Sequence, residues 1–499
     1  MTSRRYILCL CVILIAAAAL RLWGIGEKSL WLDEIMTVQK ASGTFGEMMG
    51  QIRQHDAHPP LFQIVEWLWL RMDQGDGYAR IPSVIFGVVG VWLAAMIARR
   101  LFGRGAGVAA AVVTAVSYFG IFYSQEARLH AMVATLVLAQ VWVLLRILAA
   151  RGRAGWGLWA AYGALGLASL YTYALCILTI GALAVVYLWH TGRRRLAAWW
   201  AKRPVAAAER RPEWGRFVAV HVVIAVLFLP WVGVLMDRTA MLRRALGVNP
   251  EGVGLPSARQ LIEGVAAWGI GPQEFGEGSM IGVLLGVALL LAAVVCVLDR
   301  RARRPAAILG GLFLLPLAGY LILPMPRVHL YEAKHLIFLQ PLLLIALCGA
   351  HRPLKAERRG LAAPVLYVAL ALGALNVFGL ASYYRADFQK ENWRGAADVV
   401  KKRFAPGDVV LFTPDYCGFA FGYYAGGGYP TAGAAPIMKG EQIAPEFKRL
   451  LVVSCESPVE KPALVGDALA RQGWTGEMIA NMPGAVGTVQ VHEFVRGQR

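Results

Sequence analysis

The chain has 499 residues, of which 58% are hydrophobic and only 16% are charged, and its mean hydropathy is +0.53. A soluble domain carries roughly 25% charged residues, so this composition indicates a membrane protein that crosses the bilayer several times. The formal net charge of +19 would favour a nucleic-acid partner in a soluble chain. Here the Lys and Arg residues lie in short clusters between apolar segments, and no basic face alternates with stacking aromatics. We therefore expect no nucleic-acid partner.

About eleven apolar segments are long enough to span a bilayer as a helix, which takes about 17 to 25 residues. They are residues 6–25, 81–98, 106–123, 129–148, 156–172, 174–190, 217–236, 279–298, 306–324, 335–350 and 361–382. The run 61–72 is short and contains Glu66, so we expect it to lie along the surface or to re-enter the membrane.

The basic clusters predict which side of the membrane each loop occupies. With eleven spans and 61–72 not crossing, these clusters fall on the side of Arg4 and Arg5, as the positive-inside rule requires. They lie at residues 99–104, 151–153, 193–211, 300–304 and 352–359. This pattern predicts a cytoplasmic N-terminus and an outer-side C-terminus.

After Tyr383 the composition becomes that of a small α/β domain. We expect a membrane domain over 1–384, with an outer loop at 26–80 that carries the site, and an outer domain over 385–499. Its predicted elements are helices at 393–404 and 462–472 and strands at 408–412, 450–454 and 488–494. Cys417 and Cys455 both lie there, and the sequence leaves open whether they pair.

Asp33 and Glu34 follow the first apolar segment directly. Carboxylates beside lipid are costly, so this pair is a functional candidate. Adjacent helical side chains diverge by about 100°, so only one of the two would point squarely into a cleft. The alternative is that Asp33 caps a helix over 34–40, a role that is compatible with catalysis.

Other outer loops supply histidines and cations. His58 precedes two prolines and, with His55, has the spacing His-x-x-His, but no third ligand is evident and we predict no metal site. Glu126 and Arg128 would form a surface ion pair of little energy, or Arg128 would hold a phosphate with its planar fork of donors.

A second set of cations precedes the tenth apolar segment. It contains Arg327, Lys334 and His335. The alternative for Lys334 is that its side chain only extends to the headgroup level.

Five motifs occur in an order that resembles the bacterial GT-C glycosyltransferases, relatives of the protein O-mannosyltransferases and of the aminoarabinose transferase (glycosyltransferase 39-like). The motifs are Trp31-Leu32-Asp33-Glu34, His58-Pro59-Pro60-Leu61, Arg80-Ile81-Pro82-Ser83, Arg99-Arg100-Leu101-Phe102-Gly103 and Tyr123-Ser124-Gln125-Glu126-Ala127-Arg128. The clear match covers about residues 1–150. The remainder agrees in layout, including Asn392-Trp393-Arg394 at the start of the C-terminal domain.

The resemblance implies an enzyme that passes a sugar from a polyprenyl-phosphate carrier to an acceptor on the outer face of a bacterial inner membrane. It implies that Asp33 is the catalytic carboxylate, Glu34 its companion, and His58 a residue near the donor phosphate. Two motifs depart from the family. Many relatives read Tyr-Thr-His-Tyr where this chain has Tyr171-Thr172-Tyr173-Ala174, and Arg-Tyr-Leu where it has Lys334-His335-Leu336.

The reaction we predict is an inverting displacement with Asp33 as the base. The expected phosphate-binding residues are His58, Arg128, Lys334 and His335, and the expected acceptor-side or supporting residues are Glu126, Tyr173 and Arg327. We expect Asp33 to share an outer pocket with the cations. No cofactor is firmly implied, and a divalent cation is kept as an alternative. The acceptor, whether protein, lipid or polysaccharide, is left open.

The alternative function is a transporter or flippase for a lipid-linked glycan. Such a protein places ionisable residues at the bilayer midplane, whereas here they gather at the outer rim.

Overall fold

The computed structural model describes residues 2–56, 58–200, 213–245, 257–270, 303–322, 333–350, 362–444, 446–455 and 462–496. The chain divides into two compact units. The first, called the helical unit, comprises Met1–Trp23, Gly43–Trp69 and Arg80–Leu380; the second, called the C-terminal unit, comprises Gly24–Ser42, Leu70–Ala79 and Ala381–Arg499.

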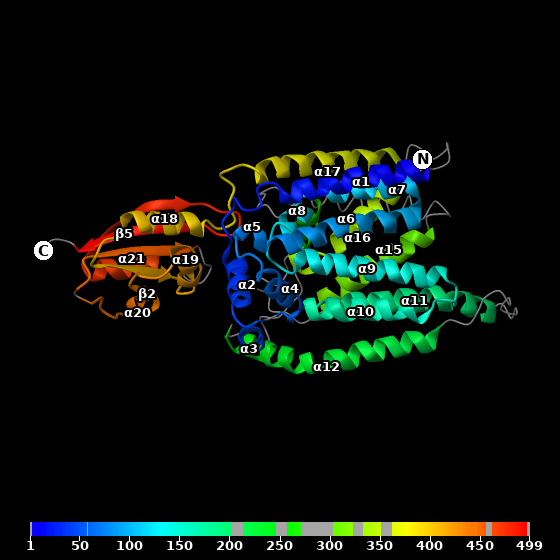
Figure 1. Ribbon diagram of the computed structural model, residues 1–499, viewed down its shortest axis with the longest axis horizontal. Coiled ribbons are helices and arrows are strands. Elements are labelled where there is room, and N and C mark those ends of the chain that lie inside the picture. Colours follow the sequence, from blue (N-terminus) through cyan, green and yellow to red (C-terminus); the bar gives the residue numbers. More distant parts are fainter. Residues whose placement is uncertain are drawn as a thin grey trace. The chain divides into compact units, whose positions relative to one another are not determined.

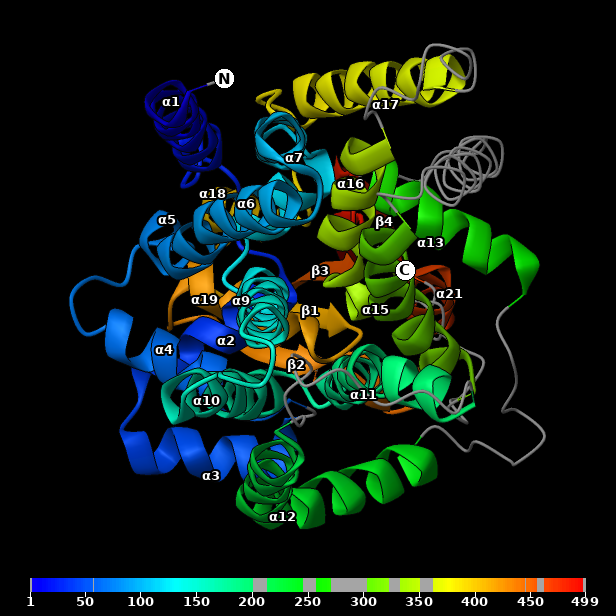
Figure 2. The ribbon, with the colours of Figure 1, turned by 90° about the vertical axis from the view of Figure 1, so that its right-hand side faces the viewer.

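Apolar helices build the helical unit, and the longer ones run in a common direction (Figure 1). The helices are α1 (Ser3–Leu22), α3 (Phe45–His55), α4 (Leu61–Trp69), α6 (Ile81–Phe102), α7 (Arg104–Ala115), α8 (Tyr118–Ser124), α9 (His130–Ala149), α10 (Trp156–Thr172), α11 (Cys176–Trp200), α12 (Trp214–Ala245), α13 (Ala258–Ile270), α15 (Arg303–Ile322), η2 (Ala333–Leu336), α16 (Leu339–Ala350) and α17 (Ala362–Tyr383). Seen end-on, α9 packs among α6, α10 and α11 (Figure 2).

Five helices in the described part of the chain are long and apolar enough to cross a membrane. They are Ser3–Leu22, Asp76–Phe102, His130–Ala149, Trp214–Arg238 and Arg303–Ile322. The pair α7 and α8 passes the same test with a 58° bend between them, and Cys176–Gly192 and Leu339–Gly349 are shorter apolar helices. The predicted polytopic α-helical class is confirmed. The number of spans and their sidedness stay predictions, and the expected span 279–298 lies outside the described residues.

Arg21, near the end of α1, stabilises the bend between α7 and α8. Its side chain is only 1% exposed. The guanidinium donates hydrogen bonds to the carbonyls of Thr114 (3.3 Å) and Ala115 (3.1 Å) and to Oγ of Ser124 (3.1 Å). Carbonyls at a helix end have no partner within the helix, and in lipid they need an internal one. The buried arginine supplies it.

The short helix α4 begins directly after Pro59 and Pro60 and has nine residues. At 1.5 Å per residue it is far shorter than the roughly 30 Å of hydrocarbon, so this helix alone is too short to span the bilayer, and the expectation that the run 61–72 does not cross stays a prediction. Glu66 on this helix is fully buried within the protein.

The C-terminal unit contains a mixed five-stranded sheet with the order β2-β1-β3-β5-β4. The strands are β1 (Asp408–Thr413), β2 (Thr431–Gly433), β3 (Arg449–Cys455), β4 (Trp474–Met482) and β5 (Val489–Arg496). The helices are α2 (Leu32–Ser42), α5 (Asp76–Ala79), α18 (Trp393–Arg403), α19 (Cys417–Ala425), α20 (Ala435–Met438) and α21 (Pro462–Arg471). β1 is parallel to β2 and β3, whereas β5 is antiparallel to β3 and β4.

The predicted strands at 408–412, 450–454 and 488–494 correspond to β1, β3 and β5, and the predicted helices to α18 and α21. Their inward side chains, among them Leu411, Leu450 and Leu469, form one apolar core. In the described part of 385–499, four elements were not predicted: the helices α19 and α20 and the two edge strands β2 and β4. Most residues of β4 are exposed or half-buried. Such a strand lacks the apolar run by which the buried strands were found.

Candidate active site

Tyr173 contacts two histidines that come from distant parts of the helical unit. Its hydroxyl lies 2.7 Å from Nδ1 of His335. Its ring centroid lies 5.5 Å from that of His58 and 6.4 Å from that of His335, with which it stacks. Tyr173 directly follows α10, His58 precedes α4, and His335 belongs to η2. Three predicted site residues are therefore brought together.

The charge of His335 differs from what its place among the cations suggests. Burial, together with the smaller effects of the neighbouring Lys334 and His58, lowers the pKa of His335 to about 3. The imidazole is neutral at physiological pH, so it can exchange a hydrogen bond with a ligand but supplies no positive charge. Of the adjacent pair, Lys334 is the cation.

Glu126 is buried, with 1% exposure, and its Oε2 lies 3.6 Å from Nδ1 of His130. The interpretation of Glu126 and Arg128 as a surface ion pair is therefore wrong. Arg128 is half-buried, and its backbone carbonyl accepts a hydrogen bond from Oγ of Ser83 (3.1 Å). The loop is further fixed by Gln125, whose amide donates to the carbonyl of Arg21 (2.9 Å).

His130, the first residue of α9, lies within electrostatic reach of each expected phosphate-binding residue. These are Arg128, Lys334, His58 and His335. We call His130, these four residues and Tyr173 the cationic cluster. His130 was not predicted as a site residue, because it opens an apolar helix. Its place two residues after Arg128 was the available signal.

Asp33 and Glu34 lie in the C-terminal unit, in the first turn of α2. The helix begins at Leu32, so the interpretation of Asp33 as the residue that caps it is wrong. Glu34 is fully buried, and its Oε2 accepts a hydrogen bond from the amide of Trp31 (3.3 Å), as the returning acid of a capping box does. Glu34 therefore serves the start of the helix, and Asp33 is half-buried beside it.

The carboxylate pair and the cationic cluster belong to different units, and the expectation that they share a pocket stays a prediction. Arg327 lies outside the described residues. Among the residues that the structure describes, no three His, Cys, Asp or Glu side chains gather as a metal site would require.

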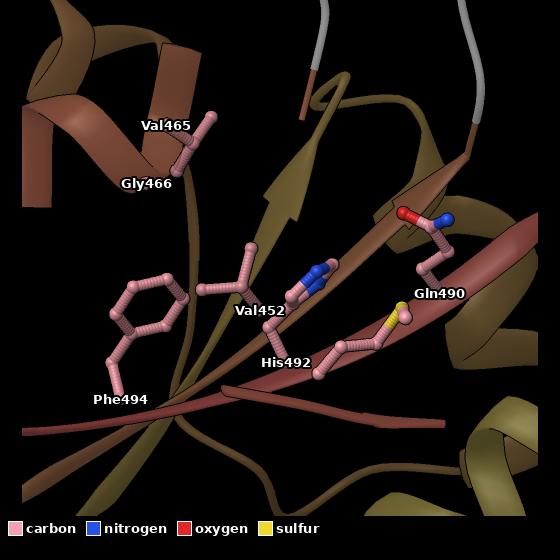
Figure 3. A pocket seen from close by; sticks show the side chains of 7 residues that line it. Val452, Val465, Gly466, Gln490, His492 and Phe494 are labelled. Carbon is pink, nitrogen blue, oxygen red and sulfur yellow. The ribbon is translucent and has the colours of Figure 1, made fainter. Parts of the chain in front are cut away.

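A cavity of ≈ 320 Å³ lies in the C-terminal unit between α21 and strands β3, β4 and β5 (Figure 3). Its lining is mostly apolar, with Gln490 and His492 on β5 as the polar side chains. It contains none of the predicted site residues.

Comparisons with known proteins bear on the family and fold. Residues 57–232, less than half of the chain, match a family model described as dolichyl-phosphate-mannose-protein mannosyltransferase. This range includes His58, Glu126, Arg128 and Tyr173. A sequence search among curated proteins gave no match.

Solved structures resemble the whole chain. ArnT from Cupriavidus metallidurans bound to undecaprenyl phosphate superposes with a TM-score of 0.55 at 14% identity, over 98% of each chain. The chain has the GT-C glycosyltransferase fold. AglB from Archaeoglobus fulgidus, an archaeal oligosaccharyltransferase in complex with an inhibitory peptide and a dolichol-phosphate, gives a TM-score of 0.50 at 12% identity, over 90% of this chain and 69% of that one. The arabinofuranosyltransferase AftD from Mycobacteria gives 0.50 at 15% identity, over 100% of this chain and 40% of its own.

The predicted GT-C fold class is confirmed, and the family-model match over residues 57–232 agrees with the predicted resemblance.

Proposed function

We propose that this GT-C protein moves a sugar from a polyprenyl-phosphate donor to an acceptor hydroxyl at the outer face of a bacterial inner membrane, with inversion at the anomeric carbon. The cationic cluster is the observation that carries the proposal. It places Arg128, Lys334 and the two histidines that contact Tyr173 within electrostatic reach of His130. A departing phosphate needs such groups, because charge-assisted hydrogen bonds stabilise the charge that develops on it.

In the proposed step, Asp33 takes the proton of the acceptor hydroxyl. The hydroxyl oxygen forms a bond to the anomeric carbon, and the bond from that carbon to the phosphate oxygen breaks. Polyprenyl phosphate departs with the electron pair of that bond. A positioned base contributes about 10²- to 10⁴-fold to such a step.

The residues of the cationic cluster would contact the phosphate in different ways. Arg128 offers a planar fork of donors, and Lys334 a compact point charge. His335, neutral because burial keeps its pKa low, takes part through its ring nitrogen, and the hydroxyl of Tyr173 orients that ring. Glu126 lies beside His130, with 3.6 Å between Oε2 and Nδ1.

The donor class is supported by the relatives that share the fold. One was solved with undecaprenyl phosphate and another with a dolichol-phosphate, and both ligands pair a polyprenyl tail with a phosphate. The basic loops support a cytoplasmic N-terminus and an outer domain over 385–499. The acceptor is a protein, lipid or polysaccharide hydroxyl.

The test incubates purified full-length protein with a panel of polyprenyl-phosphate sugars and candidate acceptors, with and without chelator, and measures the released carrier and the anomeric configuration of the product. Asp33→Asn is expected to lower turnover about 10²- to 10⁴-fold with folding preserved. Asp387→Asn is the matched control, because that carboxylate is exposed and pairs with Arg385 in the same unit.

Full turnover of Asp33→Asn would overturn the assignment of the base. A retained configuration would overturn inversion. Transbilayer movement of the intact donor without carrier release would favour the flippase instead. Loss of turnover with chelator would show that a divalent cation takes part.

A further inference from the structure

The four backbone amides just before and at the start of α2 each donate a hydrogen bond to a side chain. Buried amides need a partner, and those at a helix start find none within the helix. The bonds are Ser29 to Oε1 of Gln389 (2.8 Å), Leu30 to the hydroxyl of Tyr424 (2.7 Å), Trp31 to Oε2 of Glu34 (3.3 Å) and Leu32 to Oε2 of Glu391 (2.9 Å). Three of the four acceptors therefore come from the C-terminal part of the chain.

Glu391 makes the most direct of these links. Its side chain is buried, and the oxygen that accepts from Leu32 also accepts from Nε1 of Trp393 (2.6 Å). Trp393 is fully buried and opens α18, which Asn392 caps through the amide of Gly395. One carboxylate oxygen thus joins the first residue of α2 to the first residue of α18.

Glu391 also lies within electrostatic reach of the two candidate acids. Burial raises the pKa of Glu391, the hydrogen bonds from Trp393 and Leu32 lower it, and the charges of Asp33 and Glu34 raise it. The three carboxyl groups are therefore neighbours in the C-terminal unit.

Arg394 and Asp76 extend the same network. The guanidinium of Arg394 donates to the carbonyls of Gly26 (3.4 Å) and Glu27 (3.1 Å) and pairs with Oδ2 of Asp76 (2.6 Å). The hydroxyl of Tyr424, which accepts from Leu30, donates to the same oxygen of Asp76 (2.6 Å). The segment that leads to Asp33 is thus held along its length.

We propose that Gln389, Glu391, Arg394, Tyr424 and Asp76 form a clamp that positions the first turn of α2, and with it the carboxylate of Asp33, for sugar transfer. The inference rests on the proposed function, and it deepens that function by giving the C-terminal domain a part in it. These are positioning residues, because they act on the backbone beside Asp33. A reacting group displaced by about 1 Å loses on the order of 10²-fold in rate, so loosening this segment is expected to act on the chemical step.

The central comparison is Glu391→Ala against Glu391→Gln in the full-length protein. Alanine removes the acceptor shared by Leu32 and Trp393, whereas the carbonyl oxygen of glutamine can accept both hydrogen bonds. Arg449→Ala is the matched control, since Arg449 lies in the same unit and pairs there with Asp408 and Glu493.

Two readouts are measured: hydrogen exchange of the amides of residues 29–32, and kcat and KM for the donor. For Glu391→Ala we expect exchange at Leu32 to rise about tenfold or more and kcat to fall by about 10- to 100-fold, with KM within about threefold. Glu391→Gln should recover most of both, and Arg449→Ala should leave both near the wild-type values.

Should Glu391→Ala fail to fold, the same two readouts are measured on Tyr424→Phe, because it removes a single hydroxyl from the clamp. Unchanged exchange at residues 29–32 would overturn the clamp. Faster exchange with unchanged kcat would overturn its positioning role, and so would an equal loss in Glu391→Gln or in Arg449→Ala. If the wild type transfers no sugar, the proposed function fails and the catalytic purpose of the clamp fails with it, while the exchange measurement still decides whether the segment is held.

Discussion

Replacing His335 with glutamine removes a buried imidazole whose pKa burial lowers to about 3. A histidine in the unfolded chain has a pKa near 6.5. Because the folded-state pKa is the lower one, the unfolded state binds the proton first. Stability is therefore fully present above about pH 6.5 and is lost as the pH falls from there toward 3. pH 5 lies about 1.5 units below the pKa of the unfolded-state histidine, so protonation stabilises the unfolded state there by about 2 kcal/mol.

We therefore expect the wild type to lose about 2 kcal/mol more than His335→Gln in the free energy of unfolding between pH 7.5 and pH 5. The measurement is denaturant unfolding of the detergent-solubilised protein at both pH values, in the absence of donor. His55→Gln, at an exposed position on α3, controls for the loss of an imidazole as such. Equal pH dependence in the wild type and His335→Gln would refute the conclusion that this ring is buried and neutral.

Two further substitutions test the helical unit. Tyr173→Phe removes one hydrogen bond to the imidazole of His335, worth about 1 kcal/mol, so kcat/KM for the donor should fall about fivefold. The control is Tyr171→Phe, which loses a hydroxyl bonded to the carbonyl of Leu227 and should stay near the wild-type value. Equal losses in the two variants would contradict the role of Tyr173 in orienting His335. Gly87→Ala places a methyl group against Ser124 and should lower the free energy of unfolding by about 1 to 3 kcal/mol. Gly181→Ala, where the added group meets open space, should not; a neutral Gly87→Ala would contradict the close approach of α6 and α8.

Much of the fold follows from local pattern. Long apolar runs predicted α1, α6, α9, α12 and α15, because a spanning helix must be apolar along its whole length. The buried strands β1, β3 and β5 were found for a similar reason. The exposed edge strand β4 was missed, since its pairing with β5 stabilises it more than its own sequence indicates.

The site was predictable as a set of residues and less so as an electrostatic arrangement. The order of motifs selected His58 and Arg128, whereas Lys334 was chosen as a cation and Tyr173 as an aromatic residue in the loops expected on the outer side. Folding brings His58 to Tyr173 and places His58, Arg128 and Lys334 within electrostatic reach of His130. Sequence shows residue types and not burial, so the neutral state of His335 was not foreseen.

The acids of the clamp were missed for a different reason. Glu391 and Asp76 are ordinary acids in the sequence, and no local pattern joins Glu391 to Leu32, which precedes it by 359 positions. Only the tertiary structure pairs them.

That separation sets an order of events during synthesis. Residues 29–32 leave the ribosome early, but the acceptors of three of their four amides are translated 359 to 394 residues later. At roughly 5 to 20 residues per second, these acceptors are synthesised on the order of 20 to 80 s after residues 29–32. Chains that terminate before Gln389 lack all three acceptors, so the loop that carries Asp33 is completed only near the end of translation.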